Sequence, residues 1–367
     1  MTFETVAIIG AGTMGSGIAT NIAQHGINVR MVDISDEAVE RAIETVGGFY
    51  DRNAEKGRMS AEDAAAAKAR LSGGTDIGLA GSADLVIEAV FERFDLKEEL
   101  FGRLNPVLND ATVVATNTSC LTVSGLAEAV NDPTRFLGLH YFNPAAINPI
   151  VEVVRGERTA QDIIERCVEF CRATSKKPIL CKDSYGFALN RFFCPYSNEA
   201  VRLLEEDLGS PAQIDRVAQE TLGIAAGPFL VMNLVGMQTM AHAAANLEPH
   251  GPFYAPSAKV KEMGESNGKW EIGEASAPDA DVNADAKIAD RLWGAMFLPV
   301  LQELDEDVAS PAEIDMGAGL ALRFGKAPCA TMDAMGRDEV SRIIGYYCET
   351  YSIEAPKSLS KIGSLIG

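Results

Sequence analysis

The stretch TVAIIGAGTMGSGIATNIAQHGINVRMVDIS, Thr5–Ser35, decides the fold of this chain. It has the pattern of a short apolar strand, a glycine turn, an amphipathic helix and a second strand that ends at Asp33. Gly10 permits a tight turn, Gly12 lets an anion approach the backbone, and Gly15 lets the helix pack closely on the strand. The stretch therefore predicts a strand–helix–strand unit with an anion site at the N-terminus of its helix.

Asp33, at the end of the second strand, indicates which anionic ligand binds at this turn. It follows the glycine motif by about 20 residues, where a carboxylate binds the ribose hydroxyls of a dinucleotide and repels a 2′-phosphate. We therefore predict that NAD is preferred over NADP. Turn glycines that serve structure alone are the alternative interpretation. The predicted cofactor-binding residues of this stretch are Gly10, Gly12, Thr13, Met14, Gly15 and Asp33.

Strands and helices continue to alternate after this unit. ADLVIEAV (83–90) and ATVVATNTS (111–119) are typical of buried strands, and DLKEELFGRL (95–104) of a helix. The pattern predicts an α/β fold with an N-terminal Rossmann-type doubly wound sheet. Ligands of such sheets bind beyond the carboxyl ends of the strands. The candidate site residues there are Glu92, Lys97, Asn117 and Ser119.

The segment LHYFNPAAINPIVEVV (139–154) places a histidine before one Asn-Pro break and a glutamate after a second. Pro144 and Pro149 cannot donate to a sheet ladder, so they should end one strand and delay the next. If the strands fold back on each other, Glu152 lies beside His140 and orients it for proton transfer. A packed histidine near an unrelated surface glutamate is the alternative.

Composition excludes several classes of protein. The formal charge of −20 argues against a nucleic-acid partner, because phosphate binding requires clustered Lys and Arg. No apolar run is long enough for a membrane span, and the start MTFETVAIIGAG lacks a signal-peptide pattern, so a cytoplasmic location is expected. Seven cysteines without a C-x-x-C pair fit reduced thiols, and we expect no metal site.

The second half of the chain contains an internal repeat. Arg191 and Arg291, Ser210 and Ser310, Asp215 and Asp315, and Gly236 and Gly336 are each 100 residues apart. The repeat predicts all-α C-terminal domains related by duplication. The predicted domains are residues 1–185 for the sheet, 186–285 for the first helical domain with its linker, and 286–367 for the second.

Six motifs in this order resemble the L-3-hydroxyacyl-CoA dehydrogenase family: GAGTMG with Asp33, ADLVIEAVFERFDLK, TNTSCL, HYFNP, VEVV and DSYGFALNR. The resemblance implies NAD-dependent, reversible oxidation of a 3-hydroxyacyl-CoA to the 3-ketoacyl-CoA, in fatty acid metabolism of the β-oxidation type. It implies that His140 is the general base, that Glu152 orients it, and that Ser119 and Asn190 hydrogen-bond the substrate. It also places Glu92 and Lys97 near the nicotinamide and its ribose, makes Asn143 of the HYFNP motif a cofactor-binding residue, and puts Lys56 in a coenzyme A contact region.

Each implied role has a structural alternative. Ser119 is also suited to cap the helix begun by TVSGLAEAV, and Asn190 to be a helix residue held by turn contacts. Lys97 also fits a solvated helix face, and a solvated helix end explains the basic cluster of Arg52, Lys56 and Arg58. Cys120 and Tyr185 stand where the family often has serine and proline. These two residues border the expected acyl pocket, so the acyl chain length stays open.

Two other functions remain possible from the sequence. One is an NAD-dependent dehydrogenase of a small or sugar hydroxy acid on the same fold, and the other is a non-catalytic NAD-binding protein. The expected partner is an acyl-CoA substrate, and the chain is expected to be a monomer or a homodimer. Family members with one helical copy commonly dimerise through it, so the second copy is predicted to take a partner's place. Asp290 aligns with Asn190, so that copy should pack rather than react.

Overall fold

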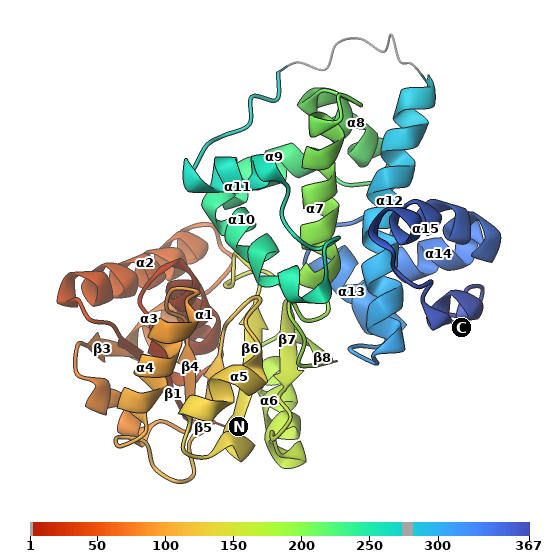
Figure 1. Ribbon diagram of the computed structural model, residues 1–367. Coiled ribbons are helices and arrows are strands. Elements are labelled where there is room, and N and C mark those ends of the chain that lie inside the picture. Colours follow the sequence, from red (N-terminus) through yellow and green to blue (C-terminus); the bar gives the residue numbers. More distant parts are fainter. Residues whose placement is uncertain (1–2, 274–281) are drawn as a thin grey trace. The chain divides into compact units, whose positions relative to one another are not determined.

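The computed structural model describes residues 3–273 and 282–367, which form two compact units, Met1–Asp183 and Ser184–Gly367 (Figure 1). The first unit is built on one eight-stranded sheet with the order β3-β2-β1-β4-β5-β6-β7-β8. Its strands are β1 (Thr5–Ile9), β2 (Asn28–Val32), β3 (Leu71–Gly74), β4 (Leu85–Glu88), β5 (Val113–Thr116), β6 (Phe136–Tyr141), β7 (Ile150–Arg155) and β8 (Lys177–Lys182).

Strands β1 to β6 are parallel, and the order reverses direction at β1. Because helices cover both faces of such a sheet, β4 and β5 are buried along their whole length. The predicted doubly wound sheet is confirmed. The helices of this unit are α1 (Thr13–Gln24), α2 (Asp36–Glu55), α3 (Ala61–Ala69), α4 (Phe94–Leu104), α5 (Val123–Leu126) and α6 (Gln161–Ala173).

Strand β7 runs antiparallel to β6, as the two Asn-Pro breaks predict. The register pairs His140 directly with Glu152. Between the strands, residues 143–149 form the turn that carries both prolines, and the Asn143–Pro144 peptide bond is cis. Opposed residues in an antiparallel pair project to the same face, so the fold itself brings the imidazole and the carboxylate together.

The second unit consists of helices, in the two copies that the sequence predicts. The first copy contains α7 (Asn190–Glu205), α8 (Pro211–Leu222), α9 (Pro228–Val235) and α10 (Met237–Asn246), followed by α11 (Ala258–Glu265). The second contains α12 (Val282–Asp305), α13 (Pro311–Leu320), α14 (Pro328–Met335) and α15 (Arg337–Tyr351). The starts of α8, α9 and α10 recur 100 residues later at α13, α14 and α15. Part of the predicted linker, residues 274–281, lies outside the described residues.

The repeated aspartate explains how each copy is built. The Asp215 carboxylate accepts hydrogen bonds from the backbone N–H groups of Phe229 and Leu230, at 2.8 and 3.1 Å, and so caps the start of α9. Asp315 caps α14 in the same way through Cys329 and Ala330, at 2.7 and 2.8 Å. A carboxylate at a helix N-terminus satisfies orphan amides and opposes the helix dipole. Within the described parts of the chain, no helix is long and apolar enough to cross a membrane.

Candidate active site

The centre of the candidate site is the buried pair on β6 and β7. His140 Nδ1 lies 2.6 Å from Glu152 Oε2, with the side chain of His140 7% exposed and that of Glu152 fully buried. A carboxylate only accepts when ionised, so this contact assigns the proton to Nδ1 and leaves proton exchange with a ligand to Nε2. The ring of Phe142 packs on the imidazole at 4.3 Å between centroids. The pair thus has the geometry of a base and its orienting carboxylate.

Glu92 organises the loop after β5. Its Oε1 accepts hydrogen bonds from the backbone N–H of Ser119 at 2.7 Å, from Ser119 Oγ at 3.1 Å and from Thr118 Oγ1 at 2.6 Å. Burial alone would raise the pKa of Glu92, but Lys97 and these donors outweigh it and lower the pKa. The carboxylate therefore stays ionised and fixes the Ser119 hydroxyl at the carboxyl end of the sheet.

The helix-cap alternative for Ser119 is wrong. Helix α5 begins after Thr122, and the carboxylate of Asp183 accepts from the backbone N–H groups of Val123 and Ser124 at 2.9 and 2.6 Å. Asp183 therefore caps this helix. Ser119 lies before it and is held by Glu92 instead.

Lys97 lies in a buried charge cluster rather than on a solvated helix face, so that alternative is also wrong. It is 1% exposed, with Nζ 2.6 Å from Glu88 Oε1 and 3.3 Å from Glu92 Oε2. Burial by itself would lower the pKa of Lys97, but the two carboxylates raise it. Glu88, which the sequence analysis missed, also accepts from Thr116 Oγ1 at 2.6 Å. Glu88 could have been recognised in the sequence as a single acid inside an otherwise apolar strand.

The nucleotide turn has the form that a dinucleotide requires. Gly10 has φ +110°, and a Cβ there would lie 2.5 Å from the carbonyl oxygen of Ala89. A Cβ on Gly15 would lie 1.9 Å from the Gly10 oxygen, whereas Gly12 faces open space. No side chain caps α1, so the amides of its first turn, including those of Thr13 and Met14, remain for an anion. These residues fit the pyrophosphate of NAD.

The acid at the end of β2 supports the same turn. Asp33 Oδ2 accepts a hydrogen bond from the backbone N–H of Ala11 at 2.7 Å, which ties the strand end to the glycine loop. At the end of β5, Asn117 Oδ1 accepts from the backbone N–H of Tyr141 at 2.8 Å. Asn143 is exposed at the start of the turn between β6 and β7. The predicted cofactor residues of the first unit therefore follow the carboxyl ends of neighbouring strands.

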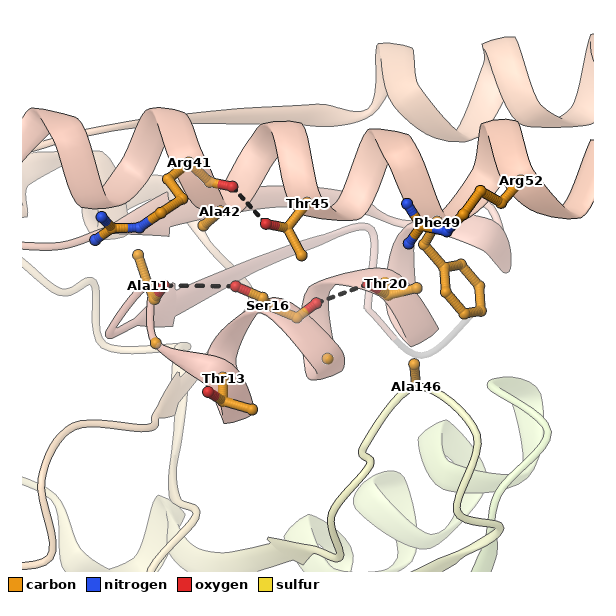
Figure 2. Close-up of a pocket in the computed structure, with 12 residues that line it drawn as sticks. Ala11, Thr13, Ser16, Thr20, Arg41, Ala42, Thr45, Phe49, Arg52 and Ala146 are labelled. Carbon is orange, nitrogen blue, oxygen red and sulfur yellow. Dashed lines mark hydrogen bonds between the residues drawn. The ribbon is translucent and has the colours of Figure 1, made fainter.

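A cleft of about 500 Å³ lies between α1 and α2 (Figure 2). Its α1 side is formed by Gly12, Ser16 and Thr20, and its α2 side includes Arg41 and Arg52. Arg52 was expected from the sequence as part of a basic cluster, whereas Arg41 was not. The spacing 41, 45, 49 and 52 on α2 follows a helix face and was the available signal. Lys56 is exposed at the C-cap of α2 and does not line the cleft.

A second buried lysine supports the turn between β6 and β7. Lys176 is 5% exposed, and Nζ donates to the carbonyl oxygens of Ala145 and Asn148, at 2.7 Å each. The ring of Tyr141 lies 6.0 Å from Nζ. Burial lowers the pKa of Lys176 to about 8. Lys176 could not be predicted from the sequence, because its acceptors are backbone atoms far away in the chain.

Asn190 is the one predicted catalytic residue in the second unit, where it opens α7. The turn before it is tight. Gly186 has φ +78°, and a Cβ there would lie 3.0 Å from the backbone nitrogen of Arg191. Asp290, its counterpart in the second copy, is bound by both terminal nitrogens of Arg342, at 2.7 and 3.0 Å. The two aligned positions therefore have different chemistry.

Comparisons with known proteins match both units. The model of the 3-hydroxyacyl-CoA dehydrogenase NAD binding domain matches residues 5–184, and that of the 3-hydroxyacyl-CoA dehydrogenase C-terminal domain matches residues 186–271. The mitochondrial hydroxyacyl-coenzyme A dehydrogenase of Mus musculus is 35% identical over 267 residues, which are 70% of this chain and 85% of that protein.

Two proteins of Escherichia coli K12 are also similar. Its 3-hydroxyadipyl-CoA dehydrogenase is 40% identical over 233 residues, which are 64% of this chain. The matched region spans about half, 49%, of that relative's length. The crystal structure of its 3-hydroxybutyryl-CoA dehydrogenase has a TM-score of 0.88 at 25% identity and covers 100% of this chain and 99% of its own.

Proposed function

The chain belongs to the 3-hydroxyacyl-CoA dehydrogenase family, and we propose that His140 and Glu152 carry out its NAD-dependent oxidation of a 3-hydroxyacyl-CoA to the 3-ketoacyl-CoA. The single observation that carries the proposal is the buried contact of 2.6 Å between His140 Nδ1 and Glu152 Oε2. It gives the imidazole one defined tautomer at the carboxyl edge of the sheet, where ligands of such folds bind.

In this mechanism, His140 Nε2 accepts the proton of the substrate's C3 hydroxyl while a hydride leaves C3. Bound NAD supplies the hydride acceptor. Glu152 stabilises the imidazolium that forms, because its negative charge is held at hydrogen-bond distance in a buried place. Ser119 and Asn190 hydrogen-bond the reacting oxygen and the thioester side of the substrate. In the reverse direction, His140 returns the proton to the oxygen of the ketone.

We assign the coenzyme A moiety to the α2 side of the cleft between α1 and α2, because Gly12 and Thr13 on the other side belong to the turn that fits NAD. Arg41 and Arg52 supply positive charge there in a chain whose net charge is −20. Guanidinium groups bind phosphate in a bidentate manner, which suits the phosphates of coenzyme A. The residues at the carboxyl ends of β1, β2, β4 and β5 are then left to NAD. Lys56, at the end of α2, is expected to meet the outer part of the same ligand.

The activity is tested by following NADH loss with 3-ketoacyl-CoAs of increasing acyl length, with the matching free 3-keto acids as controls. The proposal requires turnover of at least one thioester and little turnover of its free acid. Similar turnover of free acids would favour a small hydroxy acid as substrate. Inactivity with every compound, despite NADH binding, would favour the non-catalytic alternative. The same panel gives the preferred acyl length. Relatives are named for both 3-hydroxyadipyl-CoA and 3-hydroxybutyryl-CoA, so both lengths are included.

The cleft is tested with Arg52→Met, and Arg58→Met is the control. Arg58 is exposed beyond the end of α2 and does not line the cleft, so it controls for loss of charge alone. We expect Arg52→Met to raise KM for acetoacetyl-CoA about 10-fold, the loss of one charge-assisted phosphate contact, with KM for NADH unchanged. Equal effects of the two variants would remove the coenzyme A assignment from this cleft.

We also propose that the chain is a monomer whose second helical copy takes the place of a partner's helical domain. Arg191 of α7 binds Glu306, and Arg291 of α12 binds Glu206. Such reciprocal contacts are those of a two-fold interface, here made within one chain. Light scattering should give the chain mass of 39.2 kDa. A mass of twice that value would contradict the proposal.

A further inference from the structure

The two helical copies exchange one ion pair in each direction. The terminal nitrogens of Arg191 donate to both carboxylate oxygens of Glu306, just after α12, at 2.5 and 2.6 Å. Those of Arg291 donate to both oxygens of Glu206, just after α7, at 2.8 and 2.9 Å. Arginine and glutamate of one pair are each 100 residues from those of the other. The duplication therefore supplies two nearly equivalent interactions whose surroundings can be compared.

Only one of the two pairs adjoins a proposed substrate-binding residue. Arg191 directly follows Asn190, and its Nη1 also donates to Ser184 Oγ at 3.1 Å. The backbone N–H of Arg191 donates to the carbonyl oxygen of Gly186 at 3.1 Å. Arg191 is thus tied both to Glu306 and to the turn that leads into Asn190. A bidentate arginine contact fixes the plane of the guanidinium and hence its orientation.

The other pair is embedded differently. Arg291 follows Asp290, which is paired with Arg342, and its Nε donates to the buried carboxylate of Glu199. Arg191 is 1% exposed, and its Nε has no hydrogen-bond partner among residues 3–273 and 282–367. Glu306 binds the guanidinium of Arg191 directly and the buried carboxylate of Glu303 also favours its charge, whereas Arg291 contacts the two carboxylates of Glu199 and Glu206. The carboxylate stays ionised because Arg191 lowers the pKa of Glu306 against the opposing effect of burial.

A second set of contacts braces the same turn from the first copy. His250 Nε2 donates to the carbonyl oxygen of Tyr185 at 3.0 Å, and its ring packs on that of Tyr254 at 4.9 Å between centroids. The hydroxyl of Tyr254 donates to Gln302 Oε1 on α12 at 2.6 Å. Two routes therefore connect α12 and the residues just after it with the turn before Asn190.

We propose that Glu306, in the second helical copy, is a positioning residue for Asn190 and acts through Arg191 and the turn at Ser184–Gly186. The second copy lacks a counterpart of Asn190, and it contributes to catalysis by holding the Asn190 of the first copy. This inference rests on the proposed function, because it requires Asn190 to contact the substrate. It extends that function because the second helical copy then affects catalysis and does not only pack against the first.

The test compares Glu306→Gln with the matched variant Glu206→Gln. The two carboxylates are similarly exposed, 52% and 44%, and each variant removes one bidentate contact, although Arg291 retains Glu199 after its change. We expect Glu306→Gln to lower kcat/KM for acetoacetyl-CoA about 10- to 100-fold, the range for a misplaced positioning group, with KM for NADH unchanged. Glu206→Gln should stay within about twofold of wild type. Equal losses in both variants would overturn the proposal.

A second measurement separates positioning from general loosening. In an Asn190→Ala background, Glu306→Gln should reduce kcat/KM by no more than about twofold further, because both changes remove the same contribution. Fully multiplicative losses would show that Glu306 does not act through Asn190. If Glu306→Gln fails to fold, Glu306→Asp against Glu206→Asp makes the same comparison. Wild-type protein is assayed in parallel, since its inactivity would refute the proposed function and not this inference.

Discussion

Two buried charge clusters in the sheet domain can be compared, and they differ in whether a member is suited to exchange a proton with a ligand. In the first, His140 meets Glu152 across the β6–β7 ladder at 2.6 Å. In the second, Lys97 is enclosed by Glu88 and Glu92, at 2.6 and 3.3 Å. Both place a carboxylate beside a cationic or basic side chain away from water, where each pair must be held by accurate geometry.

The difference lies in the atoms that can exchange a proton. The carboxylates raise the pKa of Lys97, and its contacts lower the pKa of Glu92, so both groups stay charged. Imidazole has two distinct nitrogens, and one of them can be fixed by a carboxylate while the other handles a proton. The pair of His140 and Glu152 is therefore suited to proton transfer, because imidazole has a second nitrogen. The cluster of Lys97, Glu88 and Glu92 instead holds the loop around the site.

The largest expected effect is the loss of turnover when the histidine of the first cluster is removed. His140→Ala should lower kcat by about 10² to 10⁴, because it removes a positioned acid–base group. NADH affinity, measured by fluorescence titration, should change little. His140→Gln keeps a polar side chain beside Glu152 and controls for the cavity. Retention of wild-type turnover in either variant would contradict the assignment.

The next effect is on stability. Lys97→Met should lower the free energy of unfolding by about 3 kcal/mol, because it leaves the fully buried Glu88 without its counter-charge. Urea denaturation followed by circular dichroism measures this loss. Glu98→Gln on the same helix is the control for a change of charge. A loss below about 0.5 kcal/mol, the scale of exposed pairs, would show that this cluster does not stabilise the fold.

A smaller effect should follow from Glu152→Gln. The amide preserves the shape of the carboxylate but not its charge, so the imidazolium is less stabilised. We expect kcat to fall by about 10- to 100-fold, less than after loss of the base itself. Steady-state kinetics with acetoacetyl-CoA and NADH measure the change. A kinetically silent variant would reduce Glu152 to a scaffold residue.

The smallest effect concerns Lys176, a buried lysine paired with carbonyl oxygens rather than carboxylates. Burial lowers its pKa from 10.5 to about 8 in the folded protein, so the unfolded chain binds more protons between these pH values. Its contribution to stability should therefore rise with pH above about 8, and only part of that rise is accessible before other groups titrate. Urea denaturation at pH 7 and pH 9 should show this rise in wild type relative to Lys176→Met. Parallel pH dependence in the two proteins would contradict the assignment.

Features encoded in short stretches of sequence could be predicted. The glycine turn and the strands on either side of the Asn-Pro breaks each depend on residues close together in the chain, and the helical repeat was visible because the same residues recur at a constant offset of 100. Two strands were missed for local reasons. β3 has the sequence LSGG, which is poor in strand-forming residues, and β8 includes Pro178.

Partners far apart in the chain could not be predicted in the same way. Glu88 meets Thr116 across two parallel strands, and Lys176 meets carbonyl oxygens 28 and 31 residues earlier. Such pairings depend on strand order, which sequence patterns leave open. The pairing of His140 with Glu152 was accessible because two prolines and a short turn indicate a strand reversal.

His140 is proposed to move the proton in the chemical step. The most direct measurement is the single-turnover rate of NADH oxidation after enzyme saturated with NADH is mixed with acetoacetyl-CoA. We expect His140→Ala to slow this single turnover by about 10² or more, whereas Lys97→Met, at a temperature where it remains folded, should slow it much less. An unchanged single-turnover rate in His140→Ala, with only the steady state slowed, would place His140 in product release and contradict its role in proton transfer.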